Sequence, residues 1–169
     1  ATEQRILLWA ALLHDMAKPV TRGVLGGGAQ PPLDPLAREA EGFSAPGHAR
    51  KGAQMARQFL WQRGFPPSWR EQVCGLVLNH MLPYHLVDRE DWQRRLFLLC
   101  LQTRPDHLRI LARADARGRI CHDQQRLLDQ IELFWQLAQE NPLPFVDDHS
   151  RLTYFRRGGD PARTAYPEH

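Results

Sequence analysis

The sequence lacks the features that would place it in a specialised class of protein. Its three cysteines, Cys74, Cys100 and Cys121, form no CxxC motif or pairing pattern, which argues against a disulfide scaffold and favours a reducing compartment. It has no apolar run of the roughly 18 residues that a membrane helix needs, and no N-terminal segment with the layout of a signal peptide. We therefore expect a cytoplasmic protein with no membrane partner.

A strong charge excess is also missing. The formal net charge is +3 and the pI is near 9.0, so the chain permits an anionic partner without requiring one. The densest basic stretches, residues 93–95 and the C-terminal arginines, are more typical of a solvated face than of a nucleic-acid stripe. Composition therefore indicates a globular protein but identifies no partner.

What the sequence contains is a series of helical patterns joined by short connections, without a convincing strand. Apolar residues recur at helical spacing, and 169 residues suffice for one domain with a sizeable core. Pro19 is expected to end the first helix, and Ser68 with Glu71 predicts a capping box at the start of the third. The predicted class is all-α, with helices over residues 3–17, 48–63, 68–82, 88–102 or 91–102, 105–118 and 123–140.

Two segments lack this periodicity. Residues 22–47 are rich in glycine and proline and are too long for a plain connector, so we expect them to be mobile or to cover the mouth of a site. Residues 146–169 are interpreted as an extended tail. We accordingly divide the chain into one domain over residues 1–145 and a tail over residues 146–169.

Several polar residues occupy positions on the apolar faces of the predicted helices. Asp15 lies about 100° around its helix from His14, but an imidazole and a short carboxylate at a helix end can still converge on one point. Four helices each place one histidine or aspartate at four and seven residues from apolar positions: His14, His48, His80 and Asp115.

Two interpretations of these residues remain open. A single core histidine is more often hydrogen-bonded to a carbonyl group than bound to a metal, and Asp115 could simply pair with Arg119, four residues later. Burying several such groups separately costs about 1–3 kcal/mol each unless each finds a partner, and one shared metal would satisfy them together. We favour the metal site; a set of imidazoles and carboxylates suits Mn, Fe, Co, Ni or Zn better than Mg or Ca.

The remaining histidines match this pattern less well. His122 and Asp123 repeat the His-Asp dipeptide, but the residues three, four and seven positions after His122 are polar, and Asp123 is interpreted as a helix cap. A rim position is expected for His85. No inward register is found for His107, His149 and His169.

Four motifs resemble the HD-domain superfamily of metal-dependent phosphohydrolases. They are ALLHDMAKPVT (residues 11–21), similar to the His-Asp motif; APGHARKGAQMA (45–56), similar to GHxxxGA; VLNHM (77–81), similar to the next histidine; and ARADARGR (112–119), similar to the late aspartate. The likeness covers residues 5–120 and implies an all-α helical bundle. It also implies one or two divalent ions, with His14, Asp15 and Asp115 as ligands and His48 and His80 available for a second metal.

One element of the family pattern is missing. The family carries a further histidine upstream of the His-Asp pair, whereas none of the thirteen residues before His14 is a histidine. The lack of a starting Met favours a chain that is a piece of a longer protein, in which that histidine would lie upstream. The alternative is a metal site that is incomplete.

Two branches of the superfamily are similar to this chain. The HD domain of tRNA nucleotidyltransferases shares HDxxKPxT and GHxxxGA, but HMLPYHLV (residues 80–87) and residues 114–135 are closer to the HD module joined to a polynucleotide kinase in bacterial RNA end-repair enzymes. That branch implies removal of a terminal 2′-phosphate or 2′,3′-cyclic phosphate from RNA. The chain has no GxxxxGK[ST] loop, so a kinase would be a fused partner outside it.

The predicted chemistry is phosphoester hydrolysis, in which a metal lowers the pKa of a bound water molecule. Lys18 is the candidate catalytic residue, because it lies one turn after Asp15 on the same face. The candidates for phosphate binding are Thr21, Arg50, Lys51 and Arg119. Two alternatives remain: a phosphohydrolase of free nucleotides with a closed base pocket, and a non-catalytic HD module in an RNA-processing enzyme.

Overall fold

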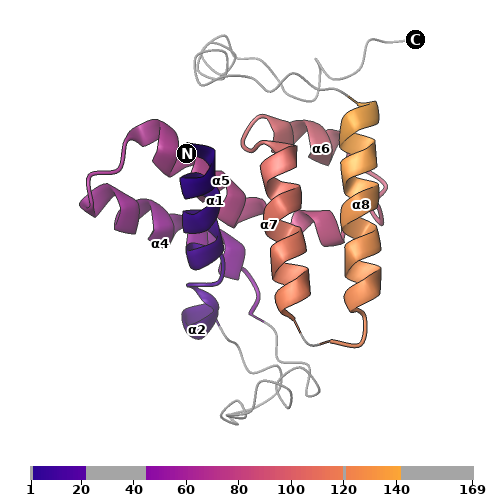
Figure 1. Cartoon of the computed structure of the whole chain (residues 1–169), viewed down its shortest axis with the longest axis horizontal. Helices are drawn as coiled ribbons and strands as arrows, with labels where there is room; N and C mark the ends of the chain where they lie inside the picture. The colour runs from indigo at the N-terminus through magenta and orange to yellow at the C-terminus, as the bar shows by residue number, and fades with distance from the viewer. Residues whose placement is uncertain (1, 22–44, 120, 142–169) are drawn as a thin grey trace.

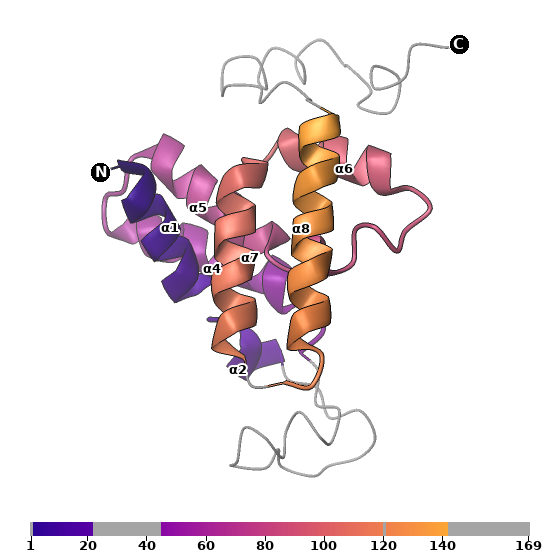
Figure 2. The ribbon, with the colours of Figure 1, turned by 45° about the vertical axis from the view of Figure 1, so that its right-hand side comes forward.

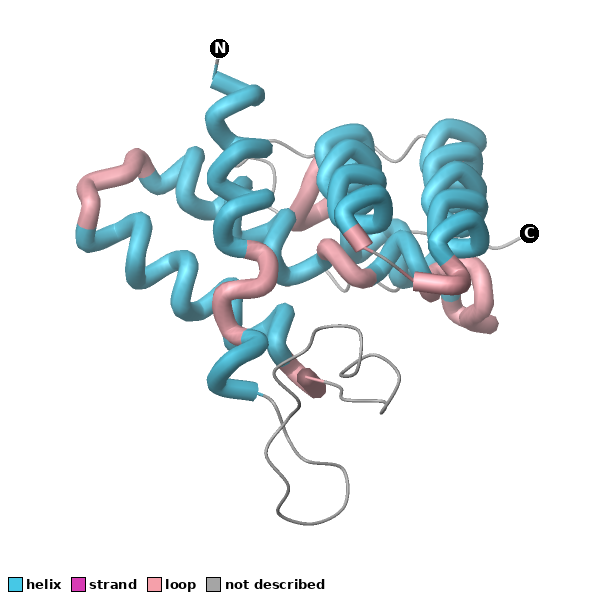
Figure 3. Tube along the Cα trace, turned by 60° about the horizontal axis from the view of Figure 1, so that its bottom comes forward, coloured by secondary structure: helices cyan, strands magenta, loops and turns pink. Residues whose placement is uncertain are grey.

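The computed structural model describes residues 2–21, 45–119 and 121–141, and their regular structure is entirely helical (Figure 3). The elements are α1 (Thr2–Leu13), α2 (Lys18–Thr21), α4 (His48–Gln62), α5 (Pro67–Asn79), the 3₁₀ turn η1 (Leu82–Tyr84), α6 (Trp92–Cys100), α7 (Pro105–Gly118) and α8 (Gln124–Glu140). The predicted all-α class is confirmed. The predicted tail and most of the glycine- and proline-rich segment lie outside the described residues. Among the helices described, none is long and apolar enough to cross a membrane.

Two groups of helices pack against each other. α1, α4 and α5 form one group, and α7 and α8 form an antiparallel pair beside it (Figures 1 and 2). α1 and α7 run parallel, because Glu3 accepts a hydrogen bond from Arg104 near the start of both helices and His14 contacts Asp115 near their other ends. The ends of two parallel helices therefore bring polar side chains to the same place.

The core forms where the apolar stripes of these helices meet. Within the described residues, each of the six helices longer than one turn contributes buried residues to it. The apolar stripe of α1 packs on both α5 and α7. Members that are at most 2% exposed include Ile6, Ala10, Leu60, Leu76, Val77, Leu96, Leu108 and Phe134. A smaller buried group joins η1 to α7 and α8 through Tyr84, Ala112, Ala116 and Ile131.

The first helix ends earlier than its apolar period predicts. α1 stops at Leu13, residues 14–17 form a turn, and α2 begins at Lys18. Pro19 therefore lies inside α2 and does not end α1; in the first turn of a helix its missing N–H group would have no helical partner in any case. The break places His14 and Asp15 between two helices, where adjacent side chains can converge.

The predicted capping box of the third helix is wrong. α5 begins at Pro67 and has no side-chain cap, so Ser68 is already inside the helix. Glu71 instead accepts a hydrogen bond of 2.7 Å from Nη2 of Arg57 on α4. α6 begins directly after Asp91, the later of its two predicted starts, and ends two residues early at Cys100. The boundaries of α4, α7 and α8 agree with the predictions to within one residue.

A glycine on α5 permits a close approach of another backbone segment. At Gly75, a Cβ atom would lie 2.5 Å from the carbonyl oxygen of Gln102 and 2.5 Å from Oγ1 of Thr103. Both distances are far below van der Waals contact, so a larger residue would force α5 to move. Gly75 lies on α5, the helix that His80 directly follows, so a movement of α5 would also displace that histidine.

Candidate metal centre

Five side chains from separate segments meet in one cluster. His14 and Asp15 come from the turn after α1, His48 from the first position of α4, His80 from the residue after α5, and Asp115 from α7. His14 Nε2 lies 3.3 Å from Asp15 Oδ2 and 3.5 Å from Asp115 Oδ1. On the other side of Asp15, Oδ1 lies 3.7 Å from His48 Nε2 and 3.8 Å from His80 Nε2. The five residues selected from the sequence are thus brought together.

The backbone of its own segment orients each histidine of the cluster. In all three, Nδ1 lies 2.7–2.8 Å from the carbonyl oxygen three residues earlier and donates its proton to it: Ala11 for His14, Ala45 for His48 and Val77 for His80. A neutral imidazole with its proton on Nδ1 has an unshared electron pair on Nε2. In the neutral form of each ring, Nε2 therefore faces the cluster as an electron-pair donor, as it does in a metal ligand.

The cluster divides into two overlapping sets of potential ligands. Asp15, His48 and His80 form one set and His14, Asp15 and Asp115 the other; within each set the ligand atoms all lie within 4.8 Å of one another. A four-coordinate metal with bonds of about 2.1 Å separates its ligand atoms by about 3.4 Å. The observed separations of 3.2–3.8 Å are close to this value. The residues fit one metal, or two that share Asp15.

Several electron pairs in the cluster have no protein partner. The buried atoms His14 Nε2 and Asp15 Oδ1 accept no hydrogen bond within the described part of the chain. His48 Nε2 and His80 Nε2 face each other at 3.2 Å, and both rings use their proton at Nδ1. Buried electron-pair donors that face one another repel, and a cation between them removes the repulsion. A mixed imidazole and carboxylate donor set fits a divalent transition metal.

Charge and burial shift the pKa values of the cluster. Burial alone would lower the pKa of His14, but the carboxylates of Asp115 and Asp15 raise it to about 10. Burial lowers the pKa of His80 to about 4. Burial would raise the pKa of Asp15, yet His14 and Lys18 hold it well below its usual range. At neutral pH, His80 is therefore a neutral donor, whereas a metal bound at His14 has to replace a proton.

Two residues outside the cluster, Tyr84 and Arg119, contact the carboxylate of Asp115. The hydroxyl group of Tyr84 lies 2.9 Å from Asp115 Oδ2 and 2.9 Å from the carbonyl oxygen of Ala112. Arg119 donates from Nη2 to the same carboxylate oxygen at 2.6 Å. The pairing of Asp115 with Arg119 is present, and it coexists with the His14 contact at Oδ1, an oxygen to which Nε of Arg119 also donates at 3.2 Å. Tyr84 was not among the predicted site residues, and only its place in the HMLPYHLV stretch pointed to it.

A cavity of about 420 Å³ opens beside the cluster. Its polar wall consists of His14, Asp15, Lys18, Asp115 and Arg119, and its apolar wall includes Ala11, Leu111 and Ala114. Lys18 donates from Nζ to Asp15 Oδ2 at 2.6 Å, so its positive charge lies next to the potential metal ligands. The cavity thus combines negative ligands with two cationic side chains.

The other predicted substrate-binding residues lie outside this cavity wall. Thr21 donates from Oγ1 to the carbonyl oxygen of Ala17 at 2.9 Å. Arg50 and Lys51 are exposed in the first turn of α4, and their side chains make no hydrogen bond or ion pair with a residue of the described ranges. Of the candidates for phosphate binding, the structure therefore places only Arg119 at the cavity, together with Lys18.

The histidines outside the cluster differ in their exposure to solvent. His122 and His85 are exposed, in agreement with the polar and rim positions predicted for them. His107 is only 4% exposed, so the prediction that it has no inward register is wrong; it points Nε2 toward Glu3 of α1, at 3.9 Å. His149 and His169 lie outside the described residues.

The profile of the HD domain family matches residues 1–119. This chain belongs to the HD domain family. Membership points to metal-dependent phosphohydrolase chemistry in general, and the cluster supplies residues of the kind that bind a divalent metal.

This HD domain is also similar to the CC-adding tRNA nucleotidyltransferase of Thermus thermophilus. The two sequences are 37% identical over 103 residues, which is 61% of this chain and 20% of that protein. The chain thus spans about a fifth of the length of that relative. No solved structure gives a significant match. The relative represents the tRNA nucleotidyltransferase branch, and the closer likeness to the kinase-linked branch stays a prediction.

Proposed function

We propose that this HD domain is a metal-dependent phosphoesterase that removes a terminal 2′-phosphate or 2′,3′-cyclic phosphate from RNA. The observation that carries the proposal is the convergence of three histidine Nε2 atoms and two carboxylates, each fixed in direction by a neighbouring group. The similarity to a protein named as a tRNA nucleotidyltransferase supports an RNA substrate.

The ligand sets suggest how metal would be held. His14, Asp15 and Asp115 would bind one ion, and Asp15, His48 and His80 would bind the second where two are present. A divalent ion such as Mn, Fe, Co, Ni or Zn would lower the pKa of a water molecule and offset charge on the phosphoryl oxygens. The chain's own residues would have to supply everything else, namely binding, orientation and exclusion of bulk water.

Lys18 and Arg119 would bind the phosphoryl group in the cavity. Lys18 uses one of its three N–H donors for Asp15, and Arg119 directs Nε and Nη2 toward Asp115, so both side chains keep donors for phosphate oxygens. These contacts would orient the phosphorus atom toward the metal ligands and stabilise the charge that develops on its oxygens. The positive end of the α4 dipole, which begins at His48, favours an anion at the same place.

Three further residues would extend the phosphate contacts beyond the reacting group. Thr21 lies at the end of α2, and Arg50 and Lys51 lie in the first turn of α4. They would bind the neighbouring phosphates of a polynucleotide, which a mononucleotide does not have. A polynucleotide kinase domain fused to this chain would act on the 5′-hydroxyl end of a broken RNA, whereas the metal centre would act on the 3′ end.

The proposal is tested with purified protein loaded with Mn or Ni. Substrates are matched RNAs that end in a 2′-phosphate, a 2′,3′-cyclic phosphate or a 3′-phosphate, together with free nucleotides. We expect hydrolysis of the first two RNAs, and loss of that activity in Asp15→Asn. Hydrolysis of free nucleotides alone would support a nucleotide phosphohydrolase instead. No hydrolysis of any substrate by metal-loaded protein would contradict the proposal and support a non-catalytic module.

A further inference from the structure

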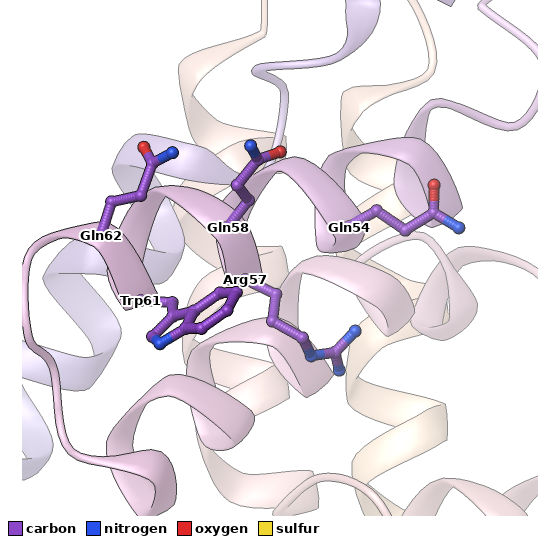
Figure 4. A pocket seen from close by; sticks show the side chains of 5 residues that line it. All are labelled: Gln54, Arg57, Gln58, Trp61 and Gln62. Atoms are coloured by element: carbon purple, nitrogen blue, oxygen red, sulfur yellow. The ribbon is translucent and has the colours of Figure 1, made fainter.

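The exposed face of α4 carries side chains that the metal centre does not use. They form two adjacent rows along the helix, and a groove of about 610 Å³ follows them (Figure 4). The first row is Gln54, Gln58 and Gln62, at a spacing of four residues, and the second is Arg57 and Trp61. Arg50 lies one turn before the first glutamine, toward the end of α4 that joins the metal centre.

The charge of this face is concentrated beside the metal centre. α4 contains three basic residues and no acidic one. Arg57, the farthest of the three from the cluster, is paired with Glu71 of α5 at 2.7 Å, so its charge is offset. Arg50 and Lys51 have no ion-pair partner within the ranges described and lie two and three residues after His48. An anion on this face would therefore bind most strongly at the end next to the cluster.

The far end of the face offers an aromatic surface and hydrogen-bonding groups. Trp61 is 70% exposed, although tryptophan is highly buried on average. The side-chain amides of Gln54, Gln58 and Gln62 are exposed and make no hydrogen bond with a residue of the described ranges. An exposed indole ring can stack on any nucleic-acid base, and amides provide both donors and acceptors for base edges.

We propose that the exposed face of α4 binds the single-stranded part of an RNA substrate, with phosphates at Arg50 and Lys51 and a base stacked on Trp61. This inference rests on the proposed function, because it identifies the substrate of the metal centre as a polynucleotide. The helix rises about 20 Å from His48 to Trp61. This length allows contacts to several consecutive nucleotides of one strand. The positive charges of Arg50 and Lys51, which have no ion-pair partner within the ranges described, favour a polyanion as the occupant of this face.

The test measures binding of a fluorescein-labelled, ten-nucleotide uridine RNA with a 3′-hydroxyl end to metal-loaded protein, by fluorescence anisotropy. This RNA has no terminal phosphate to remove. Trp61→Ala should weaken binding by about tenfold, whereas Trp61→Phe, which keeps an aromatic face, should retain most of it. The double variant Arg50→Ala with Lys51→Ala should lower the slope of log Kd against log salt by about 1.4, because each phosphate contact to a single strand contributes about 0.7.

Matched controls come from the exposed surface of α8. Leu133, which is 42% exposed, and the exposed Arg126 are replaced by alanine, and both variants should bind the RNA like the wild type. Equal binding by Trp61→Ala and the wild type, or no binding by the wild type, would overturn the inference; the latter result would favour a protein as the partner of this face.

A separate assay keeps this inference distinct from the proposed function. It follows hydrolysis of the small ester bis(p-nitrophenyl) phosphate by wild-type protein loaded with Mn. Hydrolysis without RNA binding on α4 would support the phosphoesterase and contradict the RNA-binding face. RNA binding that depends on Trp61, without hydrolysis of any phosphoester, would support the RNA-binding face and contradict the phosphoesterase.

Discussion

The His-Asp dipeptide occurs at residues 14–15 and again at residues 122–123, in two different settings. In the first copy the His14 side chain is 17% exposed and Nε2 lies within 3.5 Å of two carboxylates. In the second copy both residues are exposed in the turn before α8, and Asp123 precedes that helix without capping it through its side chain. The first pair follows a helix that packs on α5 and α7, so other elements bring ligands to it. The chemistry therefore depends on which segments converge around the dipeptide.

The largest expected contrast between the two copies is at their aspartates. Asp15→Asn should remove bound metal and lower phosphoesterase activity by about a thousandfold or more, because Asp15 belongs to both ligand sets and its negative charge is lost. Asp123→Asn should keep metal and activity near the wild-type level. Elemental analysis and the RNA hydrolysis assay measure both. Equal metal content in the two variants would remove the distinction between the copies.

The histidines provide the next contrast. His80 is fully buried and faces His48 and Asp15, so His80→Ala should lower activity by about a hundredfold. His122→Ala should have little effect. Circular dichroism checks that both variants fold, since the first leaves a space in the core. An inactive His122→Ala beside an active His80→Ala would show that the proposed site is in the wrong place.

Tyr84 tests whether a residue that contacts a potential ligand, without being a ligand itself, contributes to metal binding at the first copy. Tyr84→Phe removes only the hydroxyl group that contacts Asp115, so metal affinity should fall by about 10- to 100-fold while the fold is kept. Isothermal titration with Mn or Zn measures the affinity, and thermal unfolding of the metal-free variant measures any general loss of stability. A lower Tm with unchanged affinity would assign Tyr84 to packing alone.

The smallest expected effect concerns protons. Because the pKa of His14 is raised to about 10, this ring carries a proton at neutral pH until a metal replaces it. Each metal bound at His14 should therefore release about one proton, and affinity should rise about tenfold per pH unit below that pKa. Titration calorimetry in buffers with different ionisation enthalpies counts the protons. His122→Ala should leave the count unchanged, and a count of zero in the wild type would contradict the raised pKa.

The helical period predicted that four residues of the cluster face the interior. His14, His48, His80 and Asp115 could be selected because each shares its register with apolar neighbours, and burial imposes that register. The same rule predicted the wrong end for the first helix. The apolar pattern continues to Ala17, which is fully buried, although the chain has already left the helix after Leu13.

Features that depend on a distant segment could not be predicted in this way. Tyr84 acquires a role only because α7 brings Asp115 to its hydroxyl group, 31 residues later. His107 is 4% exposed and its Nε2 lies 3.9 Å from Glu3 of α1, a neighbour that the sequence around His107 does not indicate. Glu71 has the spacing of a cap, but Arg57 on the neighbouring helix binds it instead. In each case the role of the residue depends on a partner from another helix, which the local sequence pattern does not predict.

The close approach at Gly75 has a consequence for how this domain tolerates random change. Gly75 has no side chain that could react, bind or carry charge, yet a Cβ atom there would meet two oxygen atoms at 2.5 Å. A saturation library scored for function should therefore list position 75 among its most intolerant sites, beside the residues that carry the chemistry. A second library scored for stability would distinguish the two kinds of site. Substitutions at Gly75 would lower both the function score and the stability score, whereas substitutions at Asp15 would lower the function score alone.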